Sequence, residues 1–295
     1  MVISTVGKVQ RVIVYIVVII LVVIYLAPVY FAFVNSMREP LSTPVLSPFQ
    51  QDRVYYDNYY SALIRIPFFT FLRHSLIISG LSVSLAVFMN FLFGFAFARL
   101  NAPLKNFWFT VLISLMMIPE TATLIPQYVL FSQFKLTNSF LIWFVIGFGG
   151  SSFYTFLYRQ FLQGIPADLM EAARIDGASI PQIMFQIFVP LCVPVISIVF
   201  MYEFILSWGD VLKPFMFLHN KLWPLACTLM GTYFSLPQRP ENVLQPLQLA
   251  ASFVFIIPSF IVYLFGQKCV REGMITSGLK AYHYNTMSLR PPSRK

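Results

Sequence analysis

The chain has 295 residues, of which 58% are hydrophobic and only 11% are charged, and its mean hydropathy is +0.74. A soluble domain typically carries roughly 25% charged residues, and 32 phenylalanines cannot all be hidden in a water-soluble core of this size. Lipid must solvate many of the apolar side chains, so we predict an all-α, polytopic membrane protein. The net charge of +9 does not indicate nucleic-acid binding, because the basic residues form no stripe interleaved with stacking aromatics.

Six charge-poor apolar runs are long enough to cross a bilayer as helices. We predict transmembrane helices at Val12–Val34, Ser75–Ala98, Phe107–Phe131, Phe140–Tyr158, Val189–Trp208 and Leu249–Gly266. The first run follows two basic residues, as a signal peptide would, but it is longer than a signal h-region and no small-residue cleavage site follows it. We therefore expect one transmembrane domain over 12–266, between an N-terminal segment, 1–11, and a C-terminal tail, 267–295.

An even number of spans places both termini on one side of the membrane. The basic residues of the short connections, which set orientation, fall on that side: Lys8, Arg11, Arg99, Lys105, Arg159, Arg174, Lys268, Arg271, Lys280, Arg290, Arg294 and Lys295. The others lie mostly in two long opposite loops, 35–74 and 209–248, which the positive-inside rule discounts. Both termini are therefore predicted to be cytoplasmic. The two outer loops are either a shaped surface for a partner or lid, or passive connections.

The third predicted span contains an acidic residue, Glu120, between Pro119 and Pro126. An ionised side chain inside a bilayer costs roughly 2.5–3.5 kcal/mol on insertion scales, so it normally faces a cavity or a partner. The two prolines would break this helix and free backbone carbonyls. Glu120 is expected either to line a polar cavity or to have a structural role as a protonated or interfacial side chain.

A polar stretch, DLMEAARIDGASIPQIMFQIFVP, lies within residues 166–190, between the fourth and fifth spans on the predicted cytoplasmic side. Asp168 begins it with the spacing of an N-terminal capping box. Gly177 is a natural helix stop, because glycine adopts the left-handed conformation without penalty. Ser179 and the glutamine three residues later form a second box. We predict a short helix, a glycine turn and a second helix that enters the membrane.

Two interpretations of this hairpin remain open. A pair of small residues with polar neighbours lets another protein surface approach closely, which would make the hairpin a docking element. The residues expected at that contact are Glu171, Ala172, Ala173, Arg174, Asp176, Gly177 and Ser179. Alternatively, the hairpin rests on lipid headgroups with Met170, Ile175 and Ile180 facing lipid. A DNA-reading helix-turn-helix is disfavoured, because a hairpin tethered at both ends to the bilayer cannot enter a groove.

The fifth predicted span adds a second intramembrane acid, Glu203, one heptad before Asp210 and therefore expected on the same helix face. No pattern for catalysis or metal binding accompanies these acids. The histidines are isolated, without metal-ligand spacing: His74, His219 and His283. The cysteines are scattered and are expected to be small packing residues: Cys192, Cys227 and Cys269.

The hairpin sequence EAARIDGASIPQIMFQIFVP resembles the signature of inner-membrane permease subunits of binding-protein-dependent ABC importers, with Val189 where leucine is usual. Other stretches resemble the maltose-type, six-span carbohydrate branch of that family: FAFARL, MMIPETATLIPQYVL, LYRQFLQGIPADLMEAARIDGAS, FILSWGDVLKPF and QKCVREGMITSGLKAY. Gly209 stands where asparagine is usual, and Glu272 interrupts an Arg-Gly pair. The resemblance runs from the first span to about Ala281.

The resemblance implies the ABC importer type I permease fold in a bacterial inner membrane. The hairpin would be the coupling helix that docks on a separate dimer of ATP-binding subunits. ATP and Mg²⁺ would be bound there, and this chain would bind no cofactor, in keeping with its lack of a G-x4-GK[ST] sequence. A second, homologous permease subunit and an extracytoplasmic substrate-binding protein would complete the importer. The transported solute would be a carbohydrate, and the implied role is transport rather than catalysis.

The possible translocation-pathway residues are Glu120, Tyr202, Glu203, Trp208 and Asp210. The two aromatic rings could stack on a sugar, although aromatic residues in spans also serve as packing or interfacial anchors. The alternatives are an importer for another polar solute, such as glycerol phosphate, and an intramembrane enzyme with Glu120 and Glu203 as its acid–base pair. A secondary transporter is disfavoured, because the docking hairpin would then have no purpose. The sequence does not distinguish a neutral oligosaccharide from an acidic one.

Overall fold

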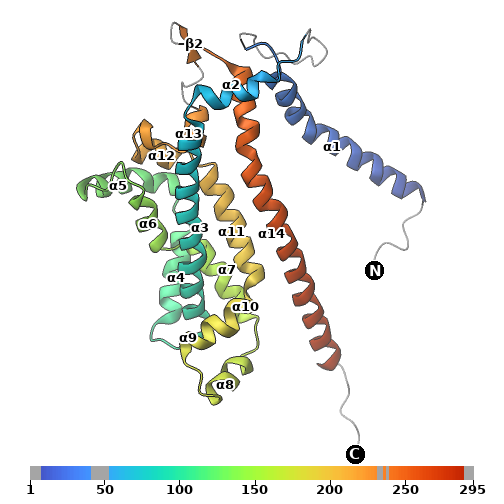
Figure 1. Ribbon diagram of the computed structural model, residues 1–295. Coiled ribbons are helices and arrows are strands. Elements are labelled where there is room, and N and C mark those ends of the chain that lie inside the picture. Colours follow the sequence, from blue (N-terminus) through green and yellow to red (C-terminus); the bar gives the residue numbers. More distant parts are fainter. Residues whose placement is uncertain (1–7, 41–52, 231–234, 237–238, 289–295) are drawn as a thin grey trace, which may run out of the picture. The chain divides into compact units, whose positions relative to one another are not determined.

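A computed structural model describes residues 8–40, 53–230, 235–236 and 239–288 (Figure 1). The helices in the first half are α1 (Lys8–Ser36), α2 (Asp57–Arg65), α3 (Phe68–Arg99), α4 (Lys105–Leu115), α5 (Glu120–Gln133), α6 (Leu141–Phe148) and α7 (Ser152–Gln163). Those of the second half are α8 (Asp168–Ile175), α9 (Ile180–Gln182), η1 (Ile183–Phe188), α10 (Val189–Leu191), α11 (Val193–Trp208), α12 (Leu212–Phe217), η2 (Asn220–Leu222), α13 (Leu225–Met230) and α14 (Gln245–Ser288).

Helices make up almost all the regular structure of these residues, as predicted. The strands found in the described part of the chain are two short antiparallel segments, β1 (Ser235–Leu236) and β2 (Arg239–Val243). They belong to the second predicted outer loop. Parts of both outer loops, 41–52, 231–234 and 237–238, lie outside the described residues, as do the end segments 1–7 and 289–295. The helix α14 continues through most of the predicted C-terminal tail.

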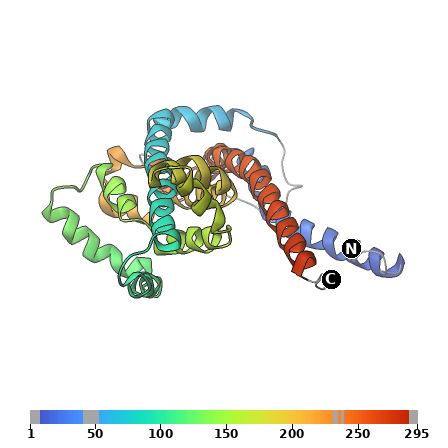
Figure 2. The same ribbon diagram turned by 90° about the horizontal axis from the view of Figure 1, so that it is seen from below.

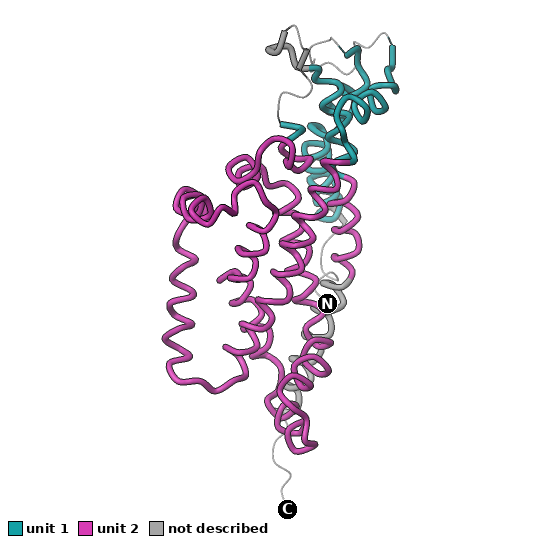
Figure 3. Tube along the Cα trace, turned by 60° about the vertical axis from the view of Figure 1, so that its left-hand side comes forward, with its two compact units in different colours: residues 1–69, 228–256 teal, residues 70–227, 257–295 magenta. Residues whose placement is uncertain are grey.

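The chain divides into two compact units, shown in Figure 3. Unit 1 comprises residues 1–69 and 228–256, and unit 2 comprises residues 70–227 and 257–295. In unit 1, the buried side chain of Asn58 ties α2 to the end of α1, because its amide donates hydrogen bonds to the carbonyls of Ser36 (2.8 Å) and Arg38 (2.7 Å). The apolar side chains along α1 itself are exposed, as expected of a helix that lipid or another chain covers.

Three of the helices are long and apolar enough to cross a membrane, and they match the predicted first, second and sixth spans. Three bent pairs meet the same criterion together: α4 with α5 (98°), α6 with α7 (44°), and 180–191 with α11 (76°). The described residues thus contain up to six spans, the number predicted. The predicted break in the third span is confirmed, whereas the bends in the fourth and fifth spans were not predicted. In the third span the break falls at Met116–Pro119, directly before the predicted proline-bounded acid.

The core of unit 2 joins the ends of α3, α7 and η1. Large apolar side chains fill it, including Phe95 of α3, Tyr158 and Leu162 of α7, and Phe188 of η1. Gly94 permits the close approach of α3 and α7, because a Cβ at this position would lie 3.2 Å from the backbone nitrogen of Arg159. Figures 1 and 2 show α8 at this end of the unit, whereas Figure 1 shows α5 and α12 near the opposite end.

Candidate functional site

The predicted hairpin forms, and its glycine turn has the expected conformation. Gly177 has φ = 80°, in the left-handed region, and beyond its two neighbours in the chain no other residue lies within 4 Å of the point that a Cβ would occupy. Its N–H donates to the carbonyl of Arg174 (3.1 Å), and the N–H of Ala178 donates to that of Ala173 (3.0 Å). These two bonds form a Schellman motif, which ends α8.

The two predicted capping boxes have different outcomes. The prediction for Asp168 was wrong: it is the first residue of α8, Ala167 occupies the cap position, and no side chain caps that end. The second box is confirmed, because the backbone N–H and the hydroxyl of Ser179 both donate to Oε1 of Gln182 at 2.8 Å. After this box the chain forms the π-helix η1 instead of continuing as a regular α-helix. π-Helical turns of this kind are frequent at functional sites.

The two alanines of the hairpin face opposite ways. Ala173 is buried (6% exposed) in the unit 2 core together with Met170, so neither is available to a partner or to lipid headgroups. The other predicted docking residues are exposed: Glu171, Ala172, Arg174, Asp176, Gly177 and Ser179. Ile175, which the docking prediction omitted, is 86% exposed at the same tip. Its position within the hairpin is the signal that could have placed it there.

A second polar site is a cavity of about 710 Å³ in unit 2. Its wall is formed by α3, α6, α7, α11 and α12, together with the end of α4, the start of α5 and the break between them. The residues that line it include four of the predicted pathway residues, Glu120, Tyr202, Glu203 and Asp210, together with Asn90, Tyr154, Ser207 and Lys213. Trp208 does not line the cavity. It is 2% exposed, and its ring stacks on that of Phe204 with the centroids 5.3 Å apart.

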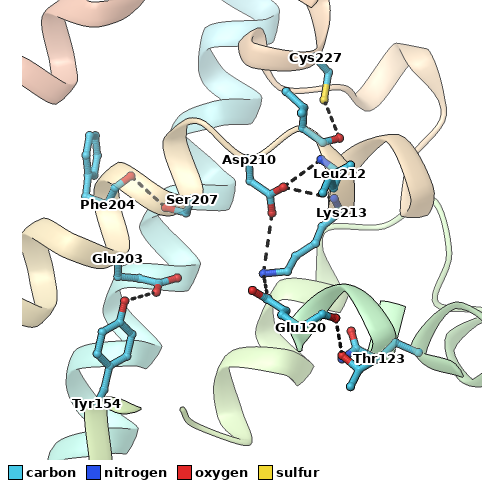
Figure 4. Close-up of polar contacts among 12 residues, drawn as sticks. Glu120, Thr123, Tyr154, Glu203, Phe204, Ser207, Asp210, Leu212, Lys213 and Cys227 are labelled. Atoms are coloured by element: carbon cyan, nitrogen blue, oxygen red, sulfur yellow. Dashed lines mark hydrogen bonds and ion pairs between the residues drawn. The ribbon is translucent and has the colours of Figure 1, made fainter. Parts of the chain in front are cut away.

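Figure 4 shows the charged groups of the cavity wall. Nζ of Lys213 lies 2.5 Å from a carboxylate oxygen of Glu120 and 3.8 Å from one of Asp210. The helix face predicted for Glu203 and Asp210 does not exist, because α11 ends at Trp208. Asp210 instead accepts the backbone N–H groups of Leu212 (3.0 Å) and Lys213 (3.3 Å) at the start of α12. The acids converge through tertiary packing.

Burial and neighbouring charges shift the pKa values of Asp210 and Lys213, which follow α11, in opposite directions. Burial raises the pKa of Asp210, against the opposing effects of Lys213 and of the backbone N–H groups. Burial alone would lower the pKa of Lys213, but the hydrogen bond and charge of Glu120, with the charges of Asp210 and Glu203, raise it. Lys213 therefore stays protonated at neutral pH.

Glu203, the acid on α11, has an uncharged hydrogen-bond partner. The hydroxyl of Tyr154 on α7 donates to Oε2 of Glu203 at 2.9 Å, which joins α7 to α11 across the cavity wall. Sequence reasoning missed both Tyr154 and Lys213. The Asp210–Lys213 spacing of three residues was a usable signal for the lysine, because charges at that spacing lie close together at a helix start.

The described residues hold no group of three or more His, Cys, Asp and Glu side chains placed to bind a metal ion. Cys192 and Cys227 are buried free thiols that pack among apolar residues, as predicted. Burial raises the pKa of Cys227 to about 12, so it is an unreactive thiol. The side chains of Cys269 and His283 lie outside the described part of the structure.

The bent-span helical fold, the exposed polar hairpin and the charged cavity define a membrane transport subunit. The chain belongs to the family described as the binding-protein-dependent transport system inner membrane component, whose model matches residues 90–271. That range contains both the hairpin and the charged groups of the cavity. The predicted permease role is confirmed: the chain is a transport subunit of the ABC importer class, located in the inner membrane, and not an enzyme.

Individual relatives agree with this family. A probable ABC transporter permease protein of Pyrococcus horikoshii is 31% identical over 209 residues, covering 69% of this chain and 73% of that protein. The arabinooligosaccharides transport system permease protein AraQ of Halalkalibacterium halodurans is 28% identical over 219 residues, covering 72% and 75%. The crystal structure of a bacterial ABC transporter involved in the import of the acidic polysaccharide alginate matches with a TM-score of 0.76, covering 90% of this chain and 99% of that chain. At 20% identity, this last match shows the shared fold.

Proposed function

We propose that this subunit forms half of the pathway through which an ATP-driven importer carries an oligosaccharide across the membrane. The other half would come from a second permease subunit, and an external binding protein would deliver the sugar. ATP and Mg²⁺ would bind to a separate ATPase dimer that contacts the hairpin 166–190. The similarity to an arabinooligosaccharide permease supports a saccharide as the cargo.

The observation that carries the docking proposal is the exposed tip of α8. Ile175 is 86% exposed beside three charged residues, Glu171, Arg174 and Asp176, none of which forms an ion pair with a described residue. An apolar side chain ringed by charges of both signs is a suitable surface for a protein groove. Because the hairpin core holds Met170 and Ala173, this tip is presented on a rigid base.

The cavity is suited to a polar, uncharged ligand. Its volume of about 710 Å³ lies within the range of roughly 300–1,000 Å³ that small-molecule sites occupy. Tyr202, 54% exposed, offers a ring face, and the carboxylates of Glu203 and Asp210 accept hydrogen bonds from sugar hydroxyls. With three acids around one lysine, the wall of this subunit disfavours an anionic solute. We therefore place a neutral oligosaccharide ahead of a uronate oligomer or glycerol phosphate.

The orientation proposal follows from the two ends of unit 2. The hairpin lies on the predicted cytoplasmic side, together with Arg99 and Lys105 at helix ends and Arg159 in the second half of α7. The charged cavity residues of α5 and α12 lie toward the opposite end (Figure 1). Both chain termini would then be cytoplasmic, and the cavity would be nearer the side where a binding protein delivers sugar.

Co-purification with the ATPase tests the docking proposal. The chain would be isolated from its native membrane in mild detergent as wild type, as Gly177→Asp and as a matched control, Ala167→Asp. The first substitution places a Cβ at φ = 80° and a charge on the docking tip. The second adds the same charge at the start of α8, where a carboxylate is favoured.

We expect wild type and Ala167→Asp to bring down an ATPase whose activity rises with binding protein and sugar, and Gly177→Asp to lose that rise. An ATPase that associates equally with all three, with equal stimulation, would contradict a docking role for the tip. Arabino-oligosaccharide, maltotriose, a uronate oligomer and glycerol 3-phosphate would be compared as cargoes. Stimulation by the last compound alone would replace the saccharide proposal with the phosphate alternative.

A further inference from the structure

Arg99, the last residue of α3, contacts both limbs of the coupling hairpin. On the incoming limb, its Nη2 donates hydrogen bonds to the carbonyls of Leu162, in the last turn of α7, and Ile165, in the connection to α8. These carbonyls lie at the negative end of a helix dipole, where a cation is favoured. On the outgoing limb, its guanidinium lies 5.2 Å from the ring centroid of Phe188, within cation–π range.

A second contact fastens the same two elements. Phe188, fully buried at the end of η1, packs edge-on against Phe95, one turn before Arg99 on α3, with the centroids 5.3 Å apart. Met170 and Ala173 of α8 belong to the same buried cluster. The last turn of α3 and the whole base of the hairpin are therefore one packed body, and Arg99 supplies its polar bonds.

The other end of this connection is the cavity. Helix α3 runs without interruption from Phe68 to Arg99, and its residues Ser82, Ala86 and Asn90 line the cavity. Asn90 is roughly 13 Å from Arg99 along the helix axis. It also accepts the N–H of Ser151 (2.7 Å) at the bend between α6 and α7. A displacement of the hairpin that reaches α3 therefore reaches the cavity wall.

We propose that Arg99 is a positioning residue that couples the hairpin to α3, so that movement of α8 by the ATPase is transmitted to the cavity wall. This inference rests on the proposed function of the hairpin as the ATPase contact. Without the Arg99 bonds, α8 would still bind the ATPase, but its movement would reach α3 only through the apolar contacts of the buried cluster, which lack the directional hydrogen bonds. Hydrolysis would then proceed with less transport.

The test compares Arg99→Met, Arg99→Lys and Arg159→Met in the whole importer, reconstituted in proteoliposomes. Methionine retains an unbranched side chain over Phe188 but removes every donor, whereas lysine keeps a cation with several N–H groups. Arg159 is the matched control: it lies on α7 over the ring of Phe109 (3.8 Å) and makes no hydrogen bond to the hairpin among the described residues. ATPase co-purification, ATP hydrolysis and arabino-oligosaccharide uptake are measured for each.

A readout independent of the cargo uses the thiol introduced by Ser82→Cys, on the α3 wall of the cavity. Its labelling rate by a membrane-impermeant maleimide is measured with and without ATP and vanadate, and the background of the parent chain is subtracted. For Arg99→Met we expect unchanged ATPase association, with uptake per ATP and the nucleotide effect on labelling both reduced about fivefold. Arg99→Lys should recover part of each, and Arg159→Met should match wild type.

Wild-type values of both readouts in Arg99→Met would overturn the proposal, as would loss of ATPase association in that variant alone. If the Arg99 variants do not reach the membrane, Phe188→Leu decides: a reduced nucleotide effect supports the proposal, and a wild-type effect overturns it. Failure of the proposed function has a different signature, because no ATPase would associate with the wild-type chain.

Discussion

The hairpin and the cavity differ in how far apart in sequence their parts lie. The hairpin is built from one continuous segment, 166–190, in which capping, turn and exposed residues follow each other at fixed spacings. The cavity gathers side chains from Ser82 to Lys213, carried by seven helices and by the breaks between them. A local element can be predicted from its own residues, whereas a cavity depends on packing between elements. The variants below test that contrast.

The largest effect is expected where the hairpin itself depends on packing. Ala173→Leu inserts three carbons into a position that is 6% exposed and should destabilise the folded subunit by up to about 3 kcal/mol. Its twin, Ala172→Leu, points outward and should leave stability unchanged while it weakens ATPase association. Thermal unfolding in detergent and co-purification measure the two effects. Equal loss of stability in both variants would show that the two faces were assigned wrongly.

The next effect concerns the lysine of the cavity. Lys213→Met leaves Asp210 buried without its cation, while the exposed Glu120 can turn to water. After a discount for partial exposure, we expect a loss of about 2 kcal/mol. The exposed Lys221→Met serves as the control.

The pH dependence of this loss has a defined sign. Because the pKa of Lys213 is raised in the folded state, its contribution is fully present below its ordinary pKa and disappears as pH rises through the raised value. The stability difference between wild type and Lys213→Met should therefore be constant near neutral pH and narrow in strongly alkaline solution. A difference that vanished between pH 6 and pH 8 would contradict the ion-pair assignment.

Two tyrosines one helical turn apart provide a smaller, internally controlled effect. Tyr154→Phe removes the hydroxyl that donates to Glu203 and should destabilise the subunit by about 1 kcal/mol. The hydroxyl of Tyr158 is buried and has no hydrogen-bond partner among the described residues, so Tyr158→Phe should change stability by less than about 0.5 kcal/mol. Sugar uptake should fall only in Tyr154→Phe. A larger loss of stability in Tyr158→Phe than in Tyr154→Phe would contradict the hydrogen bond between Tyr154 and Glu203.

The smallest effect is predicted for Asp210→Asn. The raised pKa means that this group favours folding most when protonated, and its contribution falls as pH rises through that pKa. Asparagine keeps an oxygen that can accept the N–H of Leu212 and of Lys213, and it avoids the buried charge. Stability at pH 7 should therefore change by less than about 0.5 kcal/mol, whereas Asp210→Ala should lose about 1 kcal/mol with the lost acceptor. A large loss in the asparagine variant would show that the charge itself is required.

The cavity could be predicted only in part, because its contacts join residues that are far apart in the sequence. Glu120, Tyr202, Glu203 and Asp210 were found because acids and aromatics stand out in apolar spans. Trp208 has the same kind of signal, but it faces the core, since hydropathy does not say which way a side chain points. Tyr154 was not predicted, because its hydrogen bond to Glu203 depends on the packing of α7 against α11.

The sequence by itself determined the membrane class, the positions of the apolar spans, and the glycine turn and second cap of the hairpin. Each of these rests on composition or on interactions between residues a few positions apart. The tertiary structure decided which alanine of the hairpin is buried, how sharply three spans bend, that Lys213 joins Glu120 to Asp210, and that Arg99 holds the hairpin base. These features depend on contacts between side chains that are separated by tens of residues along the chain. Only the packing of the helices brings such side chains within reach.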